Sequence, residues 1–457
     1  MNKKLISLDG MSLKEVFQKG DLATKLSFLI MGLANLKNKQ IVKGLLFLIS
    51  EILFLITFVY QVIPAVKGLI SLGTQEQGMT TKTVDGIKIQ VATQGDNSML
   101  MLIFGLASLI FCCVFAAYIY WSNIKSAAHL LTLKEEGREI PSFKKDIKSL
   151  TDGRFHMTLM SIPLIGVLLF TILPLVYMIC LAFTNYDHNH LPPKSLFDWV
   201  GFANFGNIFS GRMASTFFPV LSWTLIWAVF ATVTNFFFGI ILALLINTKG
   251  LKFKKMWRTI FVITMAVPQF ISLLIMRNLL SDAGPVNALL IKWGLISSAH
   301  PLPFLSDPVW AKFSIIFVNM WVGIPVTMLV ATGIIMNLPA EQIEAAEIDG
   351  ANKFQVFQSI TFPQILLIMT PTLIQQFIGN INNFNVIYLL TQGGPTNSTY
   401  YQAGSTDLLV TWLYNLTVTA ADYNLASVVG ILIFILSAVF SLLAYTRTNS
   451  YKEGAAK

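Results

Sequence analysis

The chain has 457 residues, of which 54% are hydrophobic and only 12% are charged, and its formal net charge is +9. Soluble domains carry about 25% charged residues, so this composition excludes an ordinary soluble protein. The basic residues lie between apolar stretches, where membrane topology places them, and do not indicate a nucleic-acid partner. Disulfide and cysteine-based metal frameworks are also excluded, because the three cysteines lie within apolar stretches: Cys112, Cys113 and Cys180.

Long uncharged stretches predict about eight membrane spans, each long enough to cross the hydrocarbon core. The sequence shows no alternation of apolar and polar residues of the kind found in membrane β-barrels. Helices are the other structure that satisfies every backbone hydrogen bond within lipid. The sequence therefore predicts an all-α, polytopic membrane protein. The predicted spans are 43–66, 99–121, 157–183, 219–247, 259–281, 310–336, 364–390 and 425–446.

Lysine and arginine predict the orientation of these spans. They are frequent before the first span, between the second and third, and between the fourth and fifth, whereas 391–424 has none. Cytoplasmic loops carry the excess of basic residues, so both termini are predicted to be cytoplasmic. The first apolar stretch has no small-residue cleavage site at its end and is interpreted as a retained helix.

The spans suggest four regions along the chain. The cytoplasmic segment 1–42 has apolar residues at helical spacing between Leu22 and Leu36, which predicts an amphipathic helix on the membrane surface. A cytosolic helix packed on the protein core is the alternative. A region of two spans follows at 43–154, then a region of six spans at 155–446 and a cytoplasmic tail at 447–457. The first two spans are joined by a polar external segment, 67–98, in which the run Val84–Ile89 suggests a small hairpin, and the next two spans by a basic cytoplasmic loop.

Few ionisable residues interrupt the spans. Glu51 lies in the first span, where a carboxylate is by default a functional candidate, but we interpret it as structural, either protonated or paired with a neighbouring helix, or as lying at a misplaced span boundary. Arg277 is interpreted as reaching to the external interface, with lining of a transport path as the alternative. Asp187, His188 and His190 crowd an external turn that lacks further ligands, so we predict a solvated turn there and no metal site.

Amide side chains interrupt the seventh span. Gln376, Asn380 and Asn383 are separated by four and three residues and therefore share one helix face. Amides buried in lipid need hydrogen-bond partners, and each amide also offers a donor and an acceptor to a sugar hydroxyl. The residues alone leave two interpretations open, helix–helix hydrogen bonds and a hydrated pathway.

The most specific motif lies in the polar loop 337–363, between the sixth and seventh spans. Glu344-Ala345-Ala346 is followed after three residues by Gly350 and after nine more by Ile360-Thr361-Phe362-Pro363. The pattern predicts two short helices separated by a glycine break, on the cytoplasmic side. Two further motifs follow it: Asn382-Asn383-Phe384 and Thr391-Gln392-Gly393-Gly394-Pro395.

Through these motifs, residues 155–446 resemble the permease subunits of ATP-binding-cassette (ABC) importers, in particular the maltose-type carbohydrate permeases. Phe362 is a departure, since the family usually has leucine there. The resemblance implies a type I ABC importer permease fold in the cytoplasmic membrane and the passage of a neutral oligosaccharide such as maltose or maltodextrin. Raffinose, galactosides and multiple sugars remain open as substrates. An ion-coupled carrier is the less favoured alternative, because the spans lack paired carboxylates and an inverted repeat.

The resemblance also implies partners. The chain is expected to join a homologous second permease, two ATPase subunits and an external solute-binding protein, within the lipid bilayer and with the oligosaccharide as its substrate. No catalytic residue, metal or cofactor is expected in this chain, and no enzyme activity. It has no Gly-x-x-x-x-Gly-Lys-Ser/Thr loop, so ATP and magnesium are expected on the ATPase subunits.

Two groups of site residues follow from the resemblance. Contact with the ATPase is expected from the loop 337–363 through Glu344, Ala345, Ala346, Asp349, Gly350 and Pro363. Contact with the substrate is expected from spans five to seven through Met265, Gln269, Gly323, Val326, Gln376, Gly379, Asn380 and Asn383. None of the substrate positions is charged, which disfavours a phosphorylated or carboxylated substrate. Met265 and Val326 stand where the best-known relative has aromatic residues, so the pocket is expected to be wider or to take a different or longer oligosaccharide.

The external segment 391–424 carries aromatic and acidic residues, and two interpretations of it remain open. Exposed aromatic side chains on a loop are frequent contact anchors, which favours a surface for the solute-binding protein. Aromatic side chains also gather at the lipid headgroups as an interfacial belt. The residues concerned are Tyr400, Tyr401, Asp407, Trp412, Tyr414 and Asp422.

Overall fold

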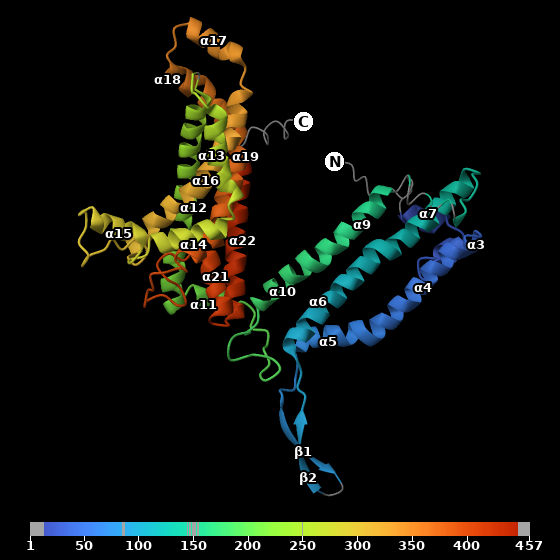
Figure 1. Cartoon of the computed structure of the whole chain (residues 1–457). Coiled ribbons are helices and arrows are strands. Elements are labelled where there is room, and N and C mark those ends of the chain that lie inside the picture. Colours follow the sequence, from blue (N-terminus) through green and yellow to red (C-terminus); the bar gives the residue numbers. More distant parts are fainter. Residues whose placement is uncertain are drawn as a thin grey trace. The chain divides into compact units, whose positions relative to one another are not determined.

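The computed structural model describes residues 13–84, 87–143, 145, 148, 152, 155–248 and 250–446. These residues are mostly helical, with a single two-stranded hairpin (Figure 1). Seven of the described helices are long and apolar enough to cross a membrane, and one bent pair raises the number of candidate spans to eight. The all-α, polytopic fold is therefore confirmed. The chain divides into two compact units, Met1–Val200 and Gly201–Lys457, which we take in turn. The tail 447–457 lies outside the described residues.

The first unit begins with three short helices in place of one amphipathic helix: α1 (Leu13–Lys19), α2 (Leu22–Leu26) and α3 (Leu33–Lys37). The expected continuous helix breaks before Gly32, which has a φ of 83°. Asp21 begins α2, where its carboxylate accepts a hydrogen bond from the backbone nitrogen of Thr24 at 2.9 Å. The same carboxylate lies 3.0 Å from the Lys37 ammonium, so α2 and α3 are joined by an ion pair.

The three spans of this unit each contain a π-helical turn, and they run over Ile41–Ser71, Ser98–Glu135 and Thr158–Leu181. Their helices, in chain order, are α4 (Ile41–Thr57), η1 (Phe58–Val62), α5 (Ile63–Ser71), α6 (Ser98–Val114), η2 (Phe115–Tyr120), α7 (Trp121–Glu135), α9 (Phe155–Val167), η3 (Leu168–Ile172) and α10 (Leu173–Leu181).

Glu51 has a structural partner. Its carboxylate in α4 accepts a hydrogen bond from the backbone nitrogen of Met31 at 2.7 Å. The turn that contains Met31 is also fixed to α7, because Asn123 accepts from the Gly32 nitrogen at 2.9 Å and donates to the Ser27 carbonyl at 2.8 Å. The N-terminal segment is therefore held against both of the first two spans.

The polar segment between these spans forms an antiparallel hairpin of β1 (Gly78–Val84) and β2 (Ile87–Thr93). Figure 1 shows it extending beyond the ends of α5 and α6. The hairpin is longer than predicted, since the run Val84–Ile89 covers only the end of β1 and the start of β2.

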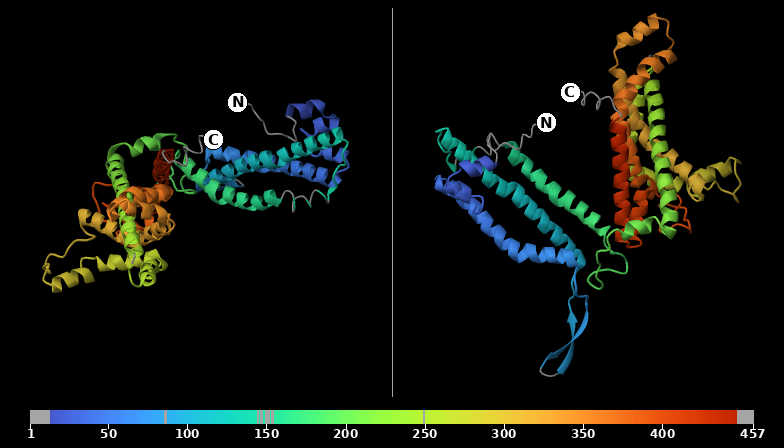
Figure 2. Two further views of the ribbon diagram at one scale, coloured as in Figure 1. Left: turned by 90° about the horizontal axis from the view of Figure 1, so that it is seen from above. Right: turned by 180° about the vertical axis from the view of Figure 1, so that it is seen from behind.

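The second unit is a helical bundle whose α12, α16, α19 and α22 run alongside one another, while α14 and α15 turn away from it (Figure 2). Buried apolar residues such as Trp227, Ile315, Met328 and Ile365 form its core. The elements are α11 (Ala203–Ile208), α12 (Gly211–Asn247), α13 (Lys254–Ala266), α14 (Gln269–Leu279), α15 (Pro285–Lys292), α16 (Pro308–Met336), α17 (Ala340–Ile348), α18 (Lys353–Val356), η4 (Phe357–Thr361), α19 (Phe362–Ile381), α20 (Phe384–Leu390), α21 (Leu409–Val418) and α22 (Tyr423–Thr446).

The predicted fifth span, 259–281, is not a straight helix. Helices α13 and α14 meet at an angle of 91°. Pro268 has no backbone N–H to continue α13 and holds the preceding Val267 in an extended conformation. Arg277 therefore lies on the bent arm α14, where its guanidinium donates to the Gln392 side chain at 3.3 Å. The seventh span also differs from its prediction, because α19 ends at Ile381 and α20 is a separate helix.

Candidate functional site

The loop 337–363 is a helix, a glycine turn and a second helix, as the motif predicts. Helix α17 ends where the Ala351 nitrogen donates to the Ala346 carbonyl at 2.9 Å and the Gly350 nitrogen donates to the Glu347 carbonyl at 3.1 Å. This pair of bonds is the Schellman arrangement, which needs a left-handed residue after the helix. Gly350 supplies it with a φ of 86°.

The second helix has its own start signal. The Asn352 side chain accepts from the Gln355 nitrogen at 2.9 Å, and the Gln355 side chain accepts from the Asn352 nitrogen at 2.8 Å. This reciprocal capping box fixes the first turn of α18. From there the chain continues through η4 into α19. Pro363 lies in the first turn of α19, where a backbone N–H would have no partner within that helix, so proline is tolerated.

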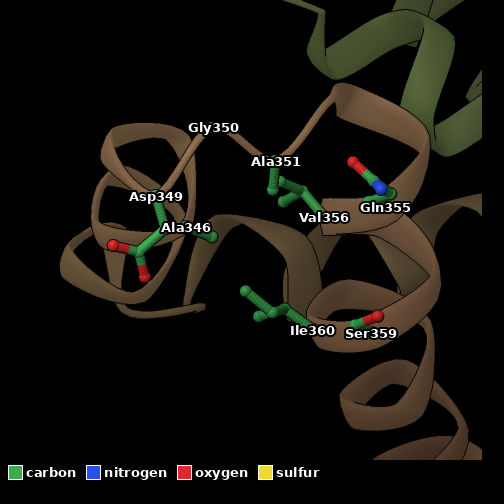
Figure 3. Close-up of a pocket in the computed structure, with 8 residues that line it drawn as sticks. All are labelled: Ala346, Asp349, Gly350, Ala351, Gln355, Val356, Ser359 and Ile360. Atoms are coloured by element: carbon green, nitrogen blue, oxygen red, sulfur yellow. The ribbon is translucent and has the colours of Figure 1, made fainter.

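The two arms of the loop enclose a shallow cleft of about 350 Å³ (Figure 3). Ala346, Asp349 and Gly350 line one wall, and Val356 and Ile360 reach toward them from the other. The remaining lining residues are Ala351, Gln355 and Ser359. Three of the six predicted coupling residues therefore meet in one concave surface.

The other three predicted coupling residues lie outside the cleft. Glu344 and Ala345 are exposed on α17, and Pro363 stands at the start of α19. Two apolar side chains of the loop were missed by sequence reasoning, since Ile348 is 85% exposed and Phe354 is 70% exposed. The signal that could have found them is a large apolar residue within a polar loop.

The predicted substrate residues of the fifth span flank the sharp bend. Met265 lies in the last turn of α13 and is 45% exposed, and Gln269 is the first residue of α14 and is half-buried. The bend therefore presents an apolar side chain and an amide on either side of Pro268.

Gly323 and Val326 in the sixth span have different surroundings. A Cβ on Gly323 would overlap the side chain of Asn235 in α12, so the glycine makes room for that amide. One helical turn along, α12 supplies the glycine and α16 the polar side chain. A Cβ on Gly239 would lie 2.6 Å from the Thr327 side chain. Val326 remains 37% exposed. Asn235 is a buried polar residue that sequence reasoning missed, although an amide in an apolar span was a visible signal.

The amides of the seventh span do not share one environment. Asn380 is buried, and its side-chain amide donates to the Thr232 hydroxyl at 3.0 Å. Its backbone carbonyl accepts from the Trp227 indole, also at 3.0 Å. Asn383 accepts from the Val386 nitrogen at 3.2 Å and so begins α20. Both side chains therefore make hydrogen bonds that pack and cap helices.

Gln376 differs from these two amides. Its Oε1 is buried and, among the described residues, finds no hydrogen-bond partner. Asn235 Oδ1, Asn319 Nδ2 and Thr327 Oγ1 share this condition. Leaving such atoms unpaired costs about 1–3 kcal/mol each, so they are the groups with the capacity to bind water or a polar ligand. Gly379, on the same helix, is exposed.

The segment 391–424 buries one of its aromatic residues and leaves the others half-buried, so both interpretations of it remain predictions. Trp412 is fully buried and donates to the Tyr401 carbonyl at 2.8 Å, while the Tyr401 hydroxyl donates to Asp422 at 2.6 Å. Arg212 at the start of α12 donates to the Ser398 carbonyl at 3.1 Å. These contacts make 391–422 a cap folded onto the bundle.

Asp407 is the carboxylate at the centre of this cap. It is 2% exposed and accepts from the Gly404 nitrogen at 2.7 Å and from the Asn415 amide at 3.3 Å. Burial raises the pKa of Asp407 to about 6, against the opposing effect of hydrogen bonds from the Gly404 nitrogen and the Thr411 side chain. The cap therefore contains a group that titrates close to neutral pH.

The acidic and histidine residues at 187–190 form a local turn. The Asp187 carboxylate accepts from the backbone nitrogens of Asn189 and His190 and lies 2.7 Å from the His190 ring. Partial burial alone would raise the pKa of Asp187, but these hydrogen bonds outweigh it and hold the pKa below its usual value. Within the described parts of the chain, no three such side chains are grouped to hold a metal ion.

Comparisons with known proteins add to this geometry. Residues 235–449 match the profile of the family described as binding-protein-dependent transport system inner membrane component. The chain is 36% identical over 433 residues to the galactooligosaccharides transport system permease protein GanP of Bacillus subtilis (strain 168), covering 93% of this chain and 97% of GanP. It is also 36% identical over 431 residues to the maltodextrin transport system permease protein MalC of Streptococcus pneumoniae serotype 4, covering 93% and 95%. The maltodextrin transport system permease protein MdxF of B. subtilis is 37% identical over 435 residues, covering 93% and 94%.

A solved structure shares the fold. The chain matches a bacterial ABC transporter that imports the acidic polysaccharide alginate, with a TM-score of 0.55 and 24% identity, over 66% of this chain and 97% of that one. The sequence matches to the maltodextrin and galactooligosaccharide permeases confirm the resemblance to the maltose-type carbohydrate permeases. The chain belongs to the family of binding-protein-dependent transport system inner membrane components, as the multi-pass permease and not as an ATPase.

Proposed function

We propose that this chain is the permease through which an ATP-driven, binding-protein-dependent importer passes a neutral oligosaccharide of the maltodextrin type. The observation that carries the proposal is the 36–37% identity over more than nine-tenths of the chain to permeases named for maltodextrin transport. A galactooligosaccharide is the second candidate, because GanP matches equally well. Both substrates are neutral sugars with hydroxyl edges and CH-bearing faces, and the proposed contact residues are uncharged.

The substrate contacts divide into direct and supporting residues. Met265, Gln269, Val326 and Gln376 line the path, with Gly379 beside them. The apolar side chains meet the CH-bearing faces of the sugar, and the amides pair with hydroxyls. Support for Gln376 comes from its buried Oε1, which has no partner among the described residues.

In this proposal, three residues support the direct contacts without touching the sugar: Gly323, Asn380 and Asn383. Gly323 admits the Asn235 side chain, and Asn380 joins α19 to α12 through Thr232. They hold the helices at the spacing that the direct contacts need.

The loop 337–363 transmits ATP hydrolysis to the bundle. Ala345 and Ala346 are small and allow close approach to an ATPase subunit, and Glu344 offers a carboxylate to a basic partner group. Asp349 and Gly350 shape the cleft, and Pro363 connects it to α19. Ile348 and Phe354 add apolar anchors on the exposed side. Two such ATPase subunits hold ATP and magnesium, and a second, homologous permease completes the pathway.

The basic segments set the topology. Both termini face the cytoplasm together with 337–363, and the hairpin β1–β2 and the cap 391–422 face outward. In this arrangement, 1–42 lies at the cytoplasmic surface, 43–154 is an accessory membrane region, 155–446 is the transport core and 447–457 is a cytoplasmic tail.

Reconstitution tests the function. The complete importer in liposomes should accumulate radiolabelled maltotriose only when ATP and the binding protein are present, and unlabelled maltotriose should compete better than galactotriose. The reverse order of competition would assign the galactooligosaccharide. Transport by this chain without any ATPase would overturn the importer and favour an ion-coupled carrier.

A further inference from the structure

The stretch 22–31, which contains α2, has its apolar side chains on the outside. Helical turns continue past the end of α2, because the Ile30 nitrogen donates to the Leu26 carbonyl at 2.8 Å. Residues three and four apart in such turns lie on the same face. One face is therefore built from four apolar residues that are 40–75% exposed, and we call it the outer face: Leu22, Leu26, Leu29 and Ile30.

The opposite face of the stretch is polar and buried. Thr24 is 4% exposed and Ser27 is 1% exposed. The Ser27 hydroxyl donates to the Asn123 side chain at 3.2 Å, and the Tyr120 hydroxyl donates to the Phe28 carbonyl at 2.9 Å. A surface helix in water buries its apolar face and exposes its polar face. The stretch 22–31 has the reverse arrangement, which suits a segment whose outer side meets lipid.

The stretch ends directly against the first span, which is itself exposed to lipid. A Cβ on Gly32 would overlap the backbone of Gly44 in α4, and Figure 1 shows α3 beside α4. Around this contact, Ile41 is 60% exposed and Leu46 is 53% exposed. The helix Ile41–Ser71 has 31 residues and a length of about 46 Å, against about 30 Å for a hydrocarbon core. The excess leaves room in the headgroup region for its first turns and for the helices beside them.

The charge of this region complements an anionic membrane surface. The segment 13–43 contains six lysines and two acidic residues. One of the two, Asp21, already lies 3.0 Å from Lys37 and 3.6 Å from Lys134. Lys19 and Lys39 stand at opposite ends of the segment 19–39 and are both exposed. Basic residues next to a span attract anionic lipid headgroups, and lysine stems reach them from beside a buried apolar face.

We propose that the outer face and its two flanking lysines form a docking site for anionic phospholipid. The four apolar side chains enter the boundary between headgroups and acyl chains, while Lys19 and Lys39 bind lipid phosphates. The inference rests on the proposed function for its cytoplasmic side. Because the buried polar face is bonded to α7 and the stretch ends against α4, the bound lipid holds the first two spans at one depth in the membrane.

The depth of a nitroxide tests the apolar part of the site. The label is carried by Leu29→Cys or by Gln18→Cys, the matched control, since Gln18 is an exposed polar residue of α1. The complete importer lies in vesicles of phosphatidylcholine and phosphatidylglycerol, with the three native cysteines replaced by alanine. Collisions with dissolved oxygen should exceed those with a water-soluble nickel chelate severalfold at position 29, and the order should reverse at position 18.

Two results at position 29 would overturn the proposal. Dominance of the nickel chelate would show that water covers the outer face. Protection from both reagents would show that a protein, such as an ATPase subunit, covers it.

A lipid titration tests the two lysines. Phosphatidylglycerol is added to the full chain in detergent, and bound lipids are counted by native mass spectrometry. One lysine near an anionic surface changes the affinity by about fivefold. The double variant Lys19→Gln, Lys39→Gln should therefore bind the first lipid roughly 25-fold more weakly. The matched control Lys194→Gln, Lys292→Gln removes two exposed lysines outside the segment and should equal the parent protein.

The same titration contains the contrary outcomes. Equal affinity of the two double variants, or equal binding of phosphatidylcholine and phosphatidylglycerol by the parent protein, would overturn the proposal. Competition by glycerol phosphate at the concentration of the lipid would assign the lysines to free phosphate and overturn it as well. Neither the depth nor the titration depends on transport. Their failure would leave ATP-driven uptake intact, and a failure of uptake in the parent importer would leave both readouts unchanged.

Discussion

Gly323 in α16 and Asn235 in α12 are fitted to each other, because the amide side chain occupies the space that a Cβ on the glycine would need. The same two helices repeat the relation with exchanged roles at Gly239 and Thr327. Each helix therefore contributes one glycine that receives a polar side chain of the other. Neighbouring residues of this kind are expected to respond together to substitution.

Gly323→Ala is expected to lower both the thermal stability of the purified subunit and sugar uptake, since overpacking costs about 1–3 kcal/mol. Asn235→Ala vacates the space for the added methyl group. The double variant should therefore recover most of the stability, which a thermal shift in detergent would measure. Additive losses in the double variant would contradict the fit.

Asn380 and Gln376 are expected to differ in the kind of defect that their loss produces. Asn380→Ala removes a hydrogen bond to Thr232, so it should destabilise the subunit by about 1–3 kcal/mol. Gln376→Ala removes a buried oxygen that has no partner among the described residues, so stability should hold while the maltotriose concentration for half-maximal uptake rises. Thermal unfolding and concentration-dependent uptake measure the two effects. Equal uptake by Gln376→Ala and the parent protein would exclude this amide from the pathway.

Gly350→Ala is expected to uncouple ATP hydrolysis from uptake. The φ of 86° costs an alanine about 1–2 kcal/mol, so the turn between α17 and α18 should rearrange and change the cleft. Uptake per ATP hydrolysed is the measurement, in liposomes that contain the complete importer. Gly206→Ala is the matched control, because a Cβ there meets no atom within 4 Å and the glycine has an ordinary φ. An unchanged ratio in Gly350→Ala would contradict the role of the turn.

The buried Asp407 predicts a pH dependence of stability. Its pKa is raised from 3.8 to about 6, so the folded state holds the proton more tightly than the unfolded state. Its contribution to stability is therefore largest below pH 3.8 and falls by about 3 kcal/mol as the pH rises through 6. Asp407→Asn removes this group.

Thermal unfolding of the two proteins between pH 4.5 and 7.5 isolates the effect, because the other titrating groups are common to both. The parent protein should lose stability relative to Asp407→Asn as the pH rises. A constant difference across the range would show that Asp407 does not titrate there.

Local sequence signals predicted the helix–turn–helix structure of the loop 337–363 well. The glycine turn and the proline at the start of α19 act through the backbone of their own residues, so their effect is visible in the sequence. The number of spans was also predictable, because hydropathy reports the length of apolar helices.

The directions of the helices and the packing of side chains between them were not predictable from local sequence signals. Hydropathy does not record the angle between α13 and α14, although Pro268 was visible. The polarity of 391–424 suggested exposure, but tertiary contacts bury Trp412 and Asp407. Likewise, helical spacing placed Gln376, Asn380 and Asn383 on one face, while the partners that distinguish them lie on α12 and at the start of α20.

The hydrogen bond between Met31 and Glu51 bears on how the protein enters the membrane. Met31 precedes Glu51 in the chain, so the partner of this carboxylate has already been synthesised when the first span leaves the ribosome. An unpaired carboxylate in lipid opposes membrane insertion. A hydrogen bond to the preceding turn reduces this cost. The bond thus pairs the carboxylate of the first span with a turn that is synthesised before it.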